Sequence, residues 1–350
     1  MKILTVFLLL NLILYSLLNA QVDSLSSFVV ADNQEAELEY NKGVENYKSK
    51  NYQKSLDHFT AATFKRANFH QAYYNRGNVQ TVLKRYQEAI SDYSEVIKIQ
   101  PGYVKAYYSK GMAFFLLKDY KNAITNFSTA ISLDPNVAKY SYYIGVAYFE
   151  SGDYKLAEKC FSEAIRIKNN YAYAYNDRGS AKKMLQKYDG AIVDYNLALK
   201  YDPGLAIAYN NMASVQCIIK DFKKAVISYS SAIRINASYF AAYNNRGSAY
   251  LNLGNMDDAI SDFKKAININ PNYAMAYNNL GIAMLKQKKY SEALTQFNKA
   301  IELDANLAEA YANRGNSKEM LHDFEGACND WQKAASFGIE NSNLYIKGCQ

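Results

Sequence analysis

A six-residue motif decides the fold of this chain: Ala72-Tyr73-Tyr74-Asn75-Arg76-Gly77. Close copies of it recur at residues 174–179, 242–247, 276–281 and 310–315, and their final glycines are separated by multiples of 34 residues. A fixed period of this length is typical of repeat architectures, in which each unit is one supersecondary element. Residues 36–341 divide into nine such units without insertion or deletion. Repeats 1 to 9 begin at residues 36, 70, 104, 138, 172, 206, 240, 274 and 308.

The columns of this internal alignment indicate two closely packed helices in each unit. Position 8 is glycine except for Ala213, and position 24 is always Phe, Tyr or Trp. Position 20 is alanine after Ser55, and position 27 is alanine except for Val96. Small residues let helices approach closely, so that large neighbours fill the gap. All four prolines fall at position 32, where a proline ends one helix and can begin the next.

The connection inside each unit also has a sequence signal. Positions 15 and 16 hold turn and N-cap residues, as in Lys118-Asp119 and Gly152-Asp153. Each unit is therefore predicted to be a helix, a short turn and a second helix.

This pattern resembles the tetratricopeptide repeat family over residues 36–341. The resemblance implies an all-α fold, a right-handed superhelix of nine helix–turn–helix units. It also implies that the first helices line a concave groove, which holds an extended peptide or a segment of a partner protein. Because each repeat buries its apolar face only against its neighbours, a terminal cap is needed. We expect residues 342–350 to supply the C-terminal cap.

Composition argues against several other classes of function. The 350 residues include only three His and four Cys, which lie far apart, so a zinc cluster or a histidine-based active site is not expected. The formal net charge of +7 is spread along the chain, whereas a nucleic-acid surface needs a basic stripe. No repeat carries an insertion that could hold a catalytic loop. The sequence therefore predicts a protein that is not an enzyme and that uses no cofactor or metal.

The N-terminal segment indicates export. Lys2 is followed by an apolar stretch and then by Ala20, which is the pattern of a signal peptide over residues 1–20. We expect cleavage after Ala20, with residues 21–35 as a linker and a periplasmic or secreted mature protein. The alternative is an uncleaved anchor, which would make the protein a membrane-bound organiser of an envelope complex.

Two columns vary together across the repeats. Arg at position 7 and Asp at position 23 occur together in four repeats and separately in none. Such covariation suggests contact, here bidentate ion pairs between the two helices of one repeat. A site for an acidic ligand built on these arginines is the alternative. The predicted pairs are Arg76–Asp92, Arg178–Asp194, Arg246–Asp262 and Arg314–Asp330.

Position 6 is asparagine in six of the nine repeats, although asparagine is a poor helix former. An amide carries donor and acceptor together, so a row of them can pair with the backbone of an extended peptide. The column is similar to the asparagine ladder of the superhelix attached to the O-linked N-acetylglucosamine transferases, which implies peptide binding. The alternative is hydrogen bonding between adjacent repeats. The residues are Asn41, Asn75, Asn211, Asn245, Asn279 and Asn313.

Position 5 divides the chain into two parts. A tyrosine-lined part suits apolar or aromatic side chains, and an asparagine-lined part suits backbone. The alternative is a surface preference without functional meaning. The predicted groove residues are Tyr40, Tyr74, Tyr108 and Tyr142, followed by Asn176, Asn210, Asn244 and Asn278.

Two of the four cysteines lie near the C-terminus. Cys328 falls in the second helix of the last repeat, and Cys349 in the predicted cap. In an exported protein a disulfide between them would fix the cap in place. The alternative is that all four thiols are free.

Overall fold

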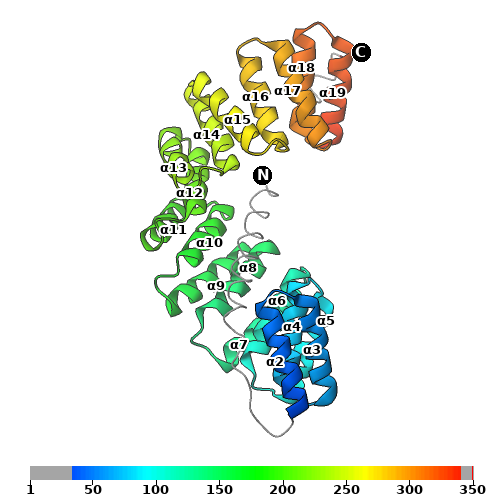
Figure 1. The fold of residues 1–350 in the computed structure, drawn as a ribbon. Coiled ribbons are helices and arrows are strands. Elements are labelled where there is room, and N and C mark those ends of the chain that lie inside the picture. The colour runs from blue at the N-terminus through cyan, green and yellow to red at the C-terminus, as the bar shows by residue number, and fades with distance from the viewer. Residues whose placement is uncertain (1–33, 340–348, 350) are drawn as a thin grey trace. The chain divides into compact units, whose positions relative to one another are not determined.

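A computed structural model describes residues 34–339 and residue 349. All regular secondary structure in this part of the chain is α-helical, in eighteen helices that Figure 1 labels α2 to α19. They form nine consecutive pairs, which confirms the predicted all-α fold and the number of repeats. Helix α2 begins at Gln34, two residues before the predicted start of repeat 1. The predicted signal peptide, most of the predicted linker and most of the predicted cap lie outside the described residues.

The chain divides into two compact units, residues 1–169 and residues 170–350. The division falls between repeats 4 and 5, where position 5 changes from tyrosine to asparagine. The helices of the first unit are α2 (Gln34–Lys48), α3 (Tyr52–Lys65), α4 (His70–Val82), α5 (Tyr86–Ile99), α6 (Val104–Leu116), α7 (Tyr120–Leu133), α8 (Ala138–Glu150) and α9 (Tyr154–Ile167).

The second unit holds five helix pairs. They are α10 (Ala172–Met184), α11 (Tyr188–Tyr201), α12 (Ala206–Ile218), α13 (Phe222–Ile235), α14 (Phe240–Leu253), α15 (Met256–Ile269), α16 (Ala274–Lys286), α17 (Tyr290–Leu303), α18 (Ala308–Met320) and α19 (Phe324–Ser336). None of the helices α2 to α19 combines the length and hydrophobicity needed to cross a membrane.

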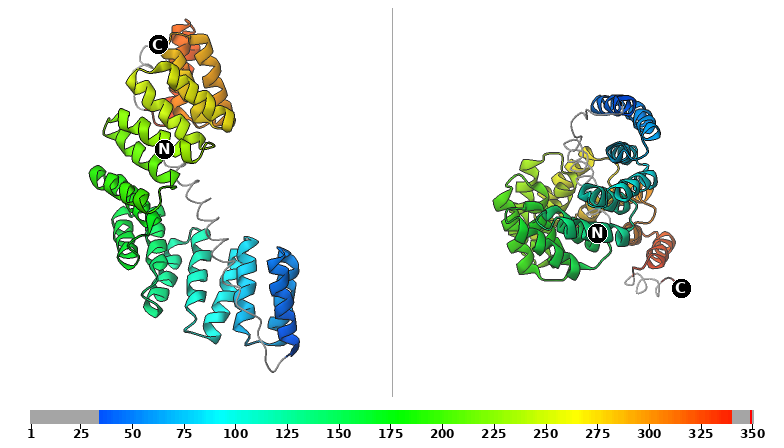
Figure 2. Two further views of the ribbon diagram at one scale, coloured as in Figure 1. Left: turned by 60° about the vertical axis from the view of Figure 1, so that its left-hand side comes forward. Right: turned by 90° about the horizontal axis from the view of Figure 1, so that it is seen from below.

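Within each unit the helices pack as a stack of pairs (Figure 2). Within each unit every helix packs against the next one along the chain, and most first helices also touch the first helix of the next repeat. These additional contacts join α2, α4 and α6 in the first unit and α10, α12, α14, α16 and α18 in the second. No two second helices pack to that extent in the described part of the chain. The first helices therefore form the inner row of each stack, the side on which the groove was predicted.

The two helices of each repeat meet at the predicted contact between position 8 and position 24. A Cβ atom placed on Gly247 would lie 2.7 Å from the Phe263 ring, and one on Gly281 would lie 2.6 Å from the Phe297 ring. Every other glycine at position 8 faces its aromatic partner in the same way. The Phe263 and Phe297 side chains are completely buried, as are the alanines at position 20. Glycine is needed here because the ring occupies the space of a side chain.

The connection between the two helices has one conformation throughout. All nine residues at position 15 have a positive φ, from 60° at Lys50 to 88° at Gly152. Position 16 is the residue just before the second helix. Four of these residues cap the helix by accepting a hydrogen bond from a backbone N–H, namely Asp119, Asp153, Asp221 and Asp323. The predicted turn is therefore present in every repeat. The side-chain cap is present in these four repeats only, because Asn255, which the sequence also offers as a cap, makes no such hydrogen bond.

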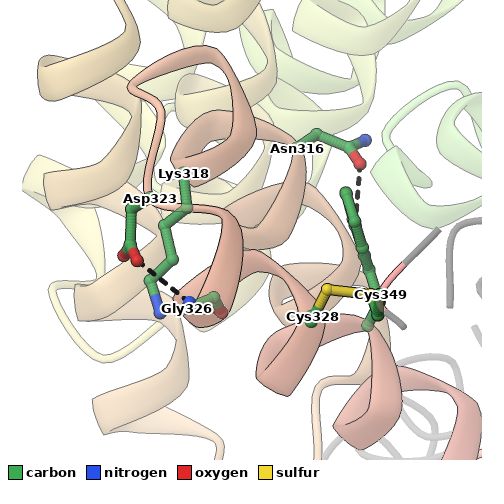
Figure 3. Close-up of a disulfide and its surroundings, with 7 residues drawn as sticks. Asn316, Lys318, Asp323, Gly326, Cys328 and Cys349 are labelled. Atoms are coloured by element: carbon green, nitrogen blue, oxygen red, sulfur yellow. Dashed lines mark hydrogen bonds between the residues drawn. A yellow bond between two sulfur atoms is a disulfide. The ribbon is translucent and has the colours of Figure 1, made fainter.

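A disulfide joins Cys328 on α19 to Cys349, with 5.8 Å between the Cα atoms (Figure 3). Asp323 caps the start of the same helix, and its carboxylate accepts from the Gly326 N–H at 2.9 Å. The disulfide ties the last described residue of the chain to the final repeat, as the sequence suggested.

The close approach at position 8 predicts a cost for any larger residue there. We expect Gly247→Ala to lower the free energy of unfolding by about 1–3 kcal/mol, because the methyl group must displace the Phe263 ring. Denaturant unfolding of the full chain measures this change. Gly102→Ala is the matched control, since nothing lies within 4 Å of a Cβ atom at Gly102. Equal stability of the two variants would contradict the steric explanation.

Candidate functional site

The residues at positions 5 and 6 of the first helices form a hydrogen-bonded ladder between repeats. In the second unit the position 6 amide of each repeat donates to the position 5 carbonyl oxygen of the repeat before it. The Nδ2–Oδ1 distances are 3.2 Å for Asn211–Asn176, 3.4 Å for Asn245–Asn210, 2.9 Å for Asn279–Asn244 and 3.0 Å for Asn313–Asn278.

Bonds within repeats join these links into a chain. Asn244 Nδ2 donates to Asn245 Oδ1 at 3.3 Å, and Asn278 Nδ2 donates to Asn279 Oδ1 at 3.3 Å. The amides from Asn313 to Asn210 are thus connected without a break. In repeat 5 the acceptor is a carboxylate, because Asn176 Nδ2 donates to Asp177 Oδ1 at 2.8 Å.

The first unit follows the same rule with hydroxyl groups at position 5. Asn75 Nδ2 donates to the Tyr40 hydroxyl at 2.9 Å, and the Tyr74 hydroxyl and Ser109 Oγ share a hydrogen bond of 3.2 Å. At the next step the Tyr108 and Tyr143 rings pack with their centroids 5.8 Å apart. Hydrogen bonding between adjacent repeats, the alternative considered for the asparagine column, is therefore present in both units.

Burial separates the predicted groove residues into two groups. Asn75, Asn176 and Asn211 are only 1–2% exposed, and Asn210, Asn244 and Asn278 are also buried. The partly exposed ladder amides are Asn245, Asn279 and Asn313, in three consecutive repeats of the second unit. Asn41 in the first unit is also partly exposed, but its Oδ1 has no hydrogen-bond partner among the described residues. Asn245, Asn279 and Asn313 therefore keep part of their surface in contact with solvent.

The tyrosine column requires a correction at its first member. Tyr40 has no exposed surface, and its ring packs between Phe59 and Phe69 with centroid distances of 5.6 and 5.1 Å. It belongs to the core, because Phe59 and Phe69 of its own repeat enclose the ring and Ala72 and Val79 of the next repeat complete the cluster. Tyr74 and Tyr142 are only 5% and 6% exposed, and Tyr108 is the partly exposed member of the column.

The exposed amides keep hydrogen-bonding capacity beyond the ladder. An amide has two N–H groups and two acceptor lone pairs. The ladder uses one N–H of Asn245 and one of Asn313, while Asn279 also approaches Ser248 Oγ at 3.4 Å. Each of the three oxygens retains at least one lone pair. The ladder therefore orients these three amides and leaves some of their hydrogen-bonding donors and acceptors unused.

The four predicted ion pairs are all bidentate. Arg246 Nε and Nη2 donate to Asp262 Oδ2 and Oδ1, both at 2.8 Å, and the other three pairs repeat this geometry at 2.6–2.9 Å. Hydrogen bonding to Asp262 raises the pKa of Arg246, although burial opposes it. Each guanidinium is thus already paired with a carboxylate of its own repeat.

Two lysines that the sequence analysis did not single out join these pairs. Lys182 Nζ lies 2.8 Å from Asp194 Oδ2, and Lys318 Nζ lies 3.0 Å from Asp330 Oδ2. Both stand at position 11, four residues after the arginine. The signal was readable in the sequence, since lysine occurs at position 11 only in repeats that have the Arg–Asp pair.

Reactive groups of other kinds are not gathered at this surface. No cluster of His, Cys, Asp and Glu that could hold a metal ion occurs among the described residues. Burial raises the pKa of the Cys160 thiol to about 11 and also raises that of Cys217. Thiols with raised pKa values are poor nucleophiles at neutral pH.

Comparison with known families agrees with this geometry. Family profiles described as tetratricopeptide repeat match residues 70–103, 104–137, 172–205 and 238–306, and a profile described as TPR repeat matches residues 145–186. Together these matches cover more than half of the chain. The chain belongs to the tetratricopeptide repeat family. No curated protein sequence gives a significant match to this tetratricopeptide repeat protein.

Several solved structures share the fold. A tetratricopeptide repeat protein from Parabacteroides merdae is similar with a TM-score of 0.58 and 19% identity, over 72% of this chain and 99% of its own. The Cut9–Hcn1 hetero-tetramer of the APC/C is similar with a TM-score of 0.58 and 14% identity, over 90% of this chain and 76% of the matched chain. The pilF protein of Pseudomonas aeruginosa is similar with a TM-score of 0.53 and 16% identity, over 61% of this chain and 96% of its own. At these identities the likeness concerns the fold alone.

The buried ion pairs predict a large penalty for removing one partner. We expect Asp262→Ala to cost on the order of 3–5 kcal/mol, because it leaves the mostly buried Arg246 guanidinium without a counter-charge. The double variant Arg246→Leu/Asp262→Gln copies Leu280 and Gln296 of repeat 8 and should recover most of that loss. Denaturant unfolding compares the two variants.

An exposed ion pair supplies the control. Lys299 and Glu302 lie on the surface of α17, so Lys299→Ala should change the unfolding midpoint little. A double variant as unstable as Asp262→Ala would show that the pair itself, and not an unpaired charge, carries the stability.

Proposed function

We propose that the protein is a non-catalytic scaffold that binds an extended segment of a partner protein along the first helices of repeats 7 to 9. The observation that carries the proposal is the row of partly exposed amides at Asn245, Asn279 and Asn313. A row of amides is suited to the N–H and C=O groups of an extended backbone, whatever its side chains.

The ladder favours binding because it holds the amides in place before a ligand arrives. A free asparagine side chain loses rotational freedom on binding, which weakens affinity. Here Asn279 is already hydrogen-bonded to Asn244 and Asn278. In the same way Asn245 is hydrogen-bonded to Asn210 and Asn244. The inter-repeat bonds and a binding role are therefore compatible.

The test is a peptide-display selection on the full chain, followed by affinity measurements with variants. We expect peptides selected on the native protein to bind at least tenfold more weakly to Asn245→Ala/Asn279→Ala/Asn313→Ala. A hydrogen bond of this kind contributes about 1 kcal/mol, so the loss of several exceeds a factor of ten. Failure to select any peptide would contradict the proposal.

Loss of the ladder could itself disturb the protein, so a matched control is needed. Asn75→Ala/Asn211→Ala also removes inter-repeat hydrogen bonds, to Tyr40 and Asn176, but both side chains are almost completely buried. This variant should keep the affinity of the native protein. Equal losses in both variants would make the ladder purely structural.

We further propose that the protein is exported. The signal-like residues 1–20 suggest this, and the disulfide between Cys328 and Cys349 supports it, because disulfides persist in oxidising compartments. Intact-mass measurement of the protein from its source should give residues 21–350 with one disulfide. Retention of residues 1–20 would favour the membrane-anchored alternative, and four free thiols would remove the support from the cysteines.

A further inference from the structure

A shallow cavity of about 330 Å³ lies between repeats 1 and 2, within the first unit. It uses none of the ladder residues and is formed by α3, α4 and α5. Most of its walls are polar, and two of its side chains are carboxylates. The lining residues are Leu56, Thr60, Arg76, Gln80, Glu88, Ser91 and Asp92.

Equivalent places in two other repeats hold an ammonium group. In repeats 5 and 9 the position 11 lysine approaches the carboxylate of the Arg–Asp pair at 2.8 Å and 3.0 Å. Repeat 2 has the same pair, with Arg76 bound to Asp92 at 2.6 and 2.7 Å, but Gln80 replaces the lysine. The cavity lies beside that pair.

Gln80 is left with an unsatisfied acceptor. Its side chain is 94% buried, since only 6% of the residue is exposed, and Oε1 has no hydrogen-bond partner among the described residues. In repeat 6 the corresponding Gln216 Oε1 accepts from Ser228 at 2.9 Å. Asp92 stands in place of that serine and, when ionised, has no proton to donate. A buried acceptor without a donor is costly, so a donor entering the cavity would relieve the cost.

The charge around the cavity is also unbalanced. Arg76 faces two carboxylates, Asp92 and the exposed Glu88. Burial is the largest influence on the pKa of Asp92 and raises it, and the negative charge of Glu88 also raises it. Hydrogen bonds from Arg76 and from the Gln80 amide act in the opposite direction and lower it. The lining therefore carries a net negative charge, where repeats 5 and 9 place a lysine of their own.

We propose that this cavity binds the ammonium group of a lysine side chain from a partner polypeptide. The ammonium donates to Gln80 Oε1, after a small rotation of that amide, and to the Asp92 carboxylate. A lysine fits this description best, because the group found in repeats 5 and 9 is an ammonium on a flexible stem. Water could satisfy Gln80, but it would not balance the charge.

The first test places the ligand on the chain itself. We expect Gln80→Lys to raise the melting temperature of the full chain by about 2–4 °C above that of Gln80→Met, by recreating the arrangement of repeats 5 and 9. The methionine variant fills the same volume and removes the unsatisfied oxygen without adding charge. A lysine variant no more stable than the methionine variant would show that the cavity does not accept an ammonium.

The second test measures binding from solution. The probe is a blocked pentapeptide with a central lysine between alanines, titrated into full chain with ¹⁵N-labelled glutamine. We expect it to shift the Gln80 side-chain amide resonances of the native protein. Calorimetric titration of the same peptide should show binding to the native protein and none to Gln80→Lys, whose own ammonium occupies the site. The same peptide with an acetylated lysine should bind at least tenfold more weakly.

Three results would overturn the proposal. They are the absence of a shift with the lysine peptide, equal binding of the acetylated peptide, and unchanged binding to Gln80→Lys. If n-butylammonium binds at least as tightly as the peptide, the ligand is a free amine and not a polypeptide. None of these outcomes bears on repeats 7 to 9, so the groove proposal stands or falls separately.

Discussion

The contact between glycine at position 8 and an aromatic ring at position 24 sets the distance between the two helices in eight of the nine repeats, and repeat 6 has Ala213 in place of the glycine. In repeat 7 the Phe263 ring fills the space where Gly247 would carry a side chain. At this separation the buried alanines at positions 20 and 27 fit between the helices, and Arg246 reaches Asp262 with both of its donors. The first helices, held in this way, bring positions 5 and 6 of adjacent repeats within hydrogen-bonding distance.

In the function proposed here, the same ladder serves stability and recognition together. Each amide has more donors and acceptors than one neighbour can use, so a bond to the preceding repeat leaves capacity for another group. Exposure then decides which members can use it. Asn211 is enclosed by its neighbours, whereas Asn245, Asn279 and Asn313 keep an open side. The buried amides and the proposed binding amides are thus different members of the same row.

The sequence predicted what depends on residue type at a fixed spacing. Several features can be read from residue types that recur at a fixed spacing: the period, the helix pairs, the glycine–aromatic contact and the Arg–Asp pairs. The cysteine pair was predicted from the positions of Cys328 and Cys349 near the C-terminus. The sequence could not predict how far a neighbouring repeat closes over a side chain, so Tyr40 was assigned to the groove although it lies in the core. The sequence also could not predict that Gln80 Oε1 lacks a hydrogen-bond donor, because this depends on the residue beside it, Asp92, and not on Gln80 alone.

The ladder bonds join residues 35 apart, one repeat plus one residue. Inserting a single residue would turn the following helix by about 100° and remove the amides from each other's reach. Removing a whole repeat is different. Without residues 240–273, Asn279 would meet Asn210, which offers the same amide that Asn244 offers now. Genetic duplication or loss in steps of one repeat therefore leaves compatible interfaces behind, so such a protein can change its length while mutations of other sizes are selected against.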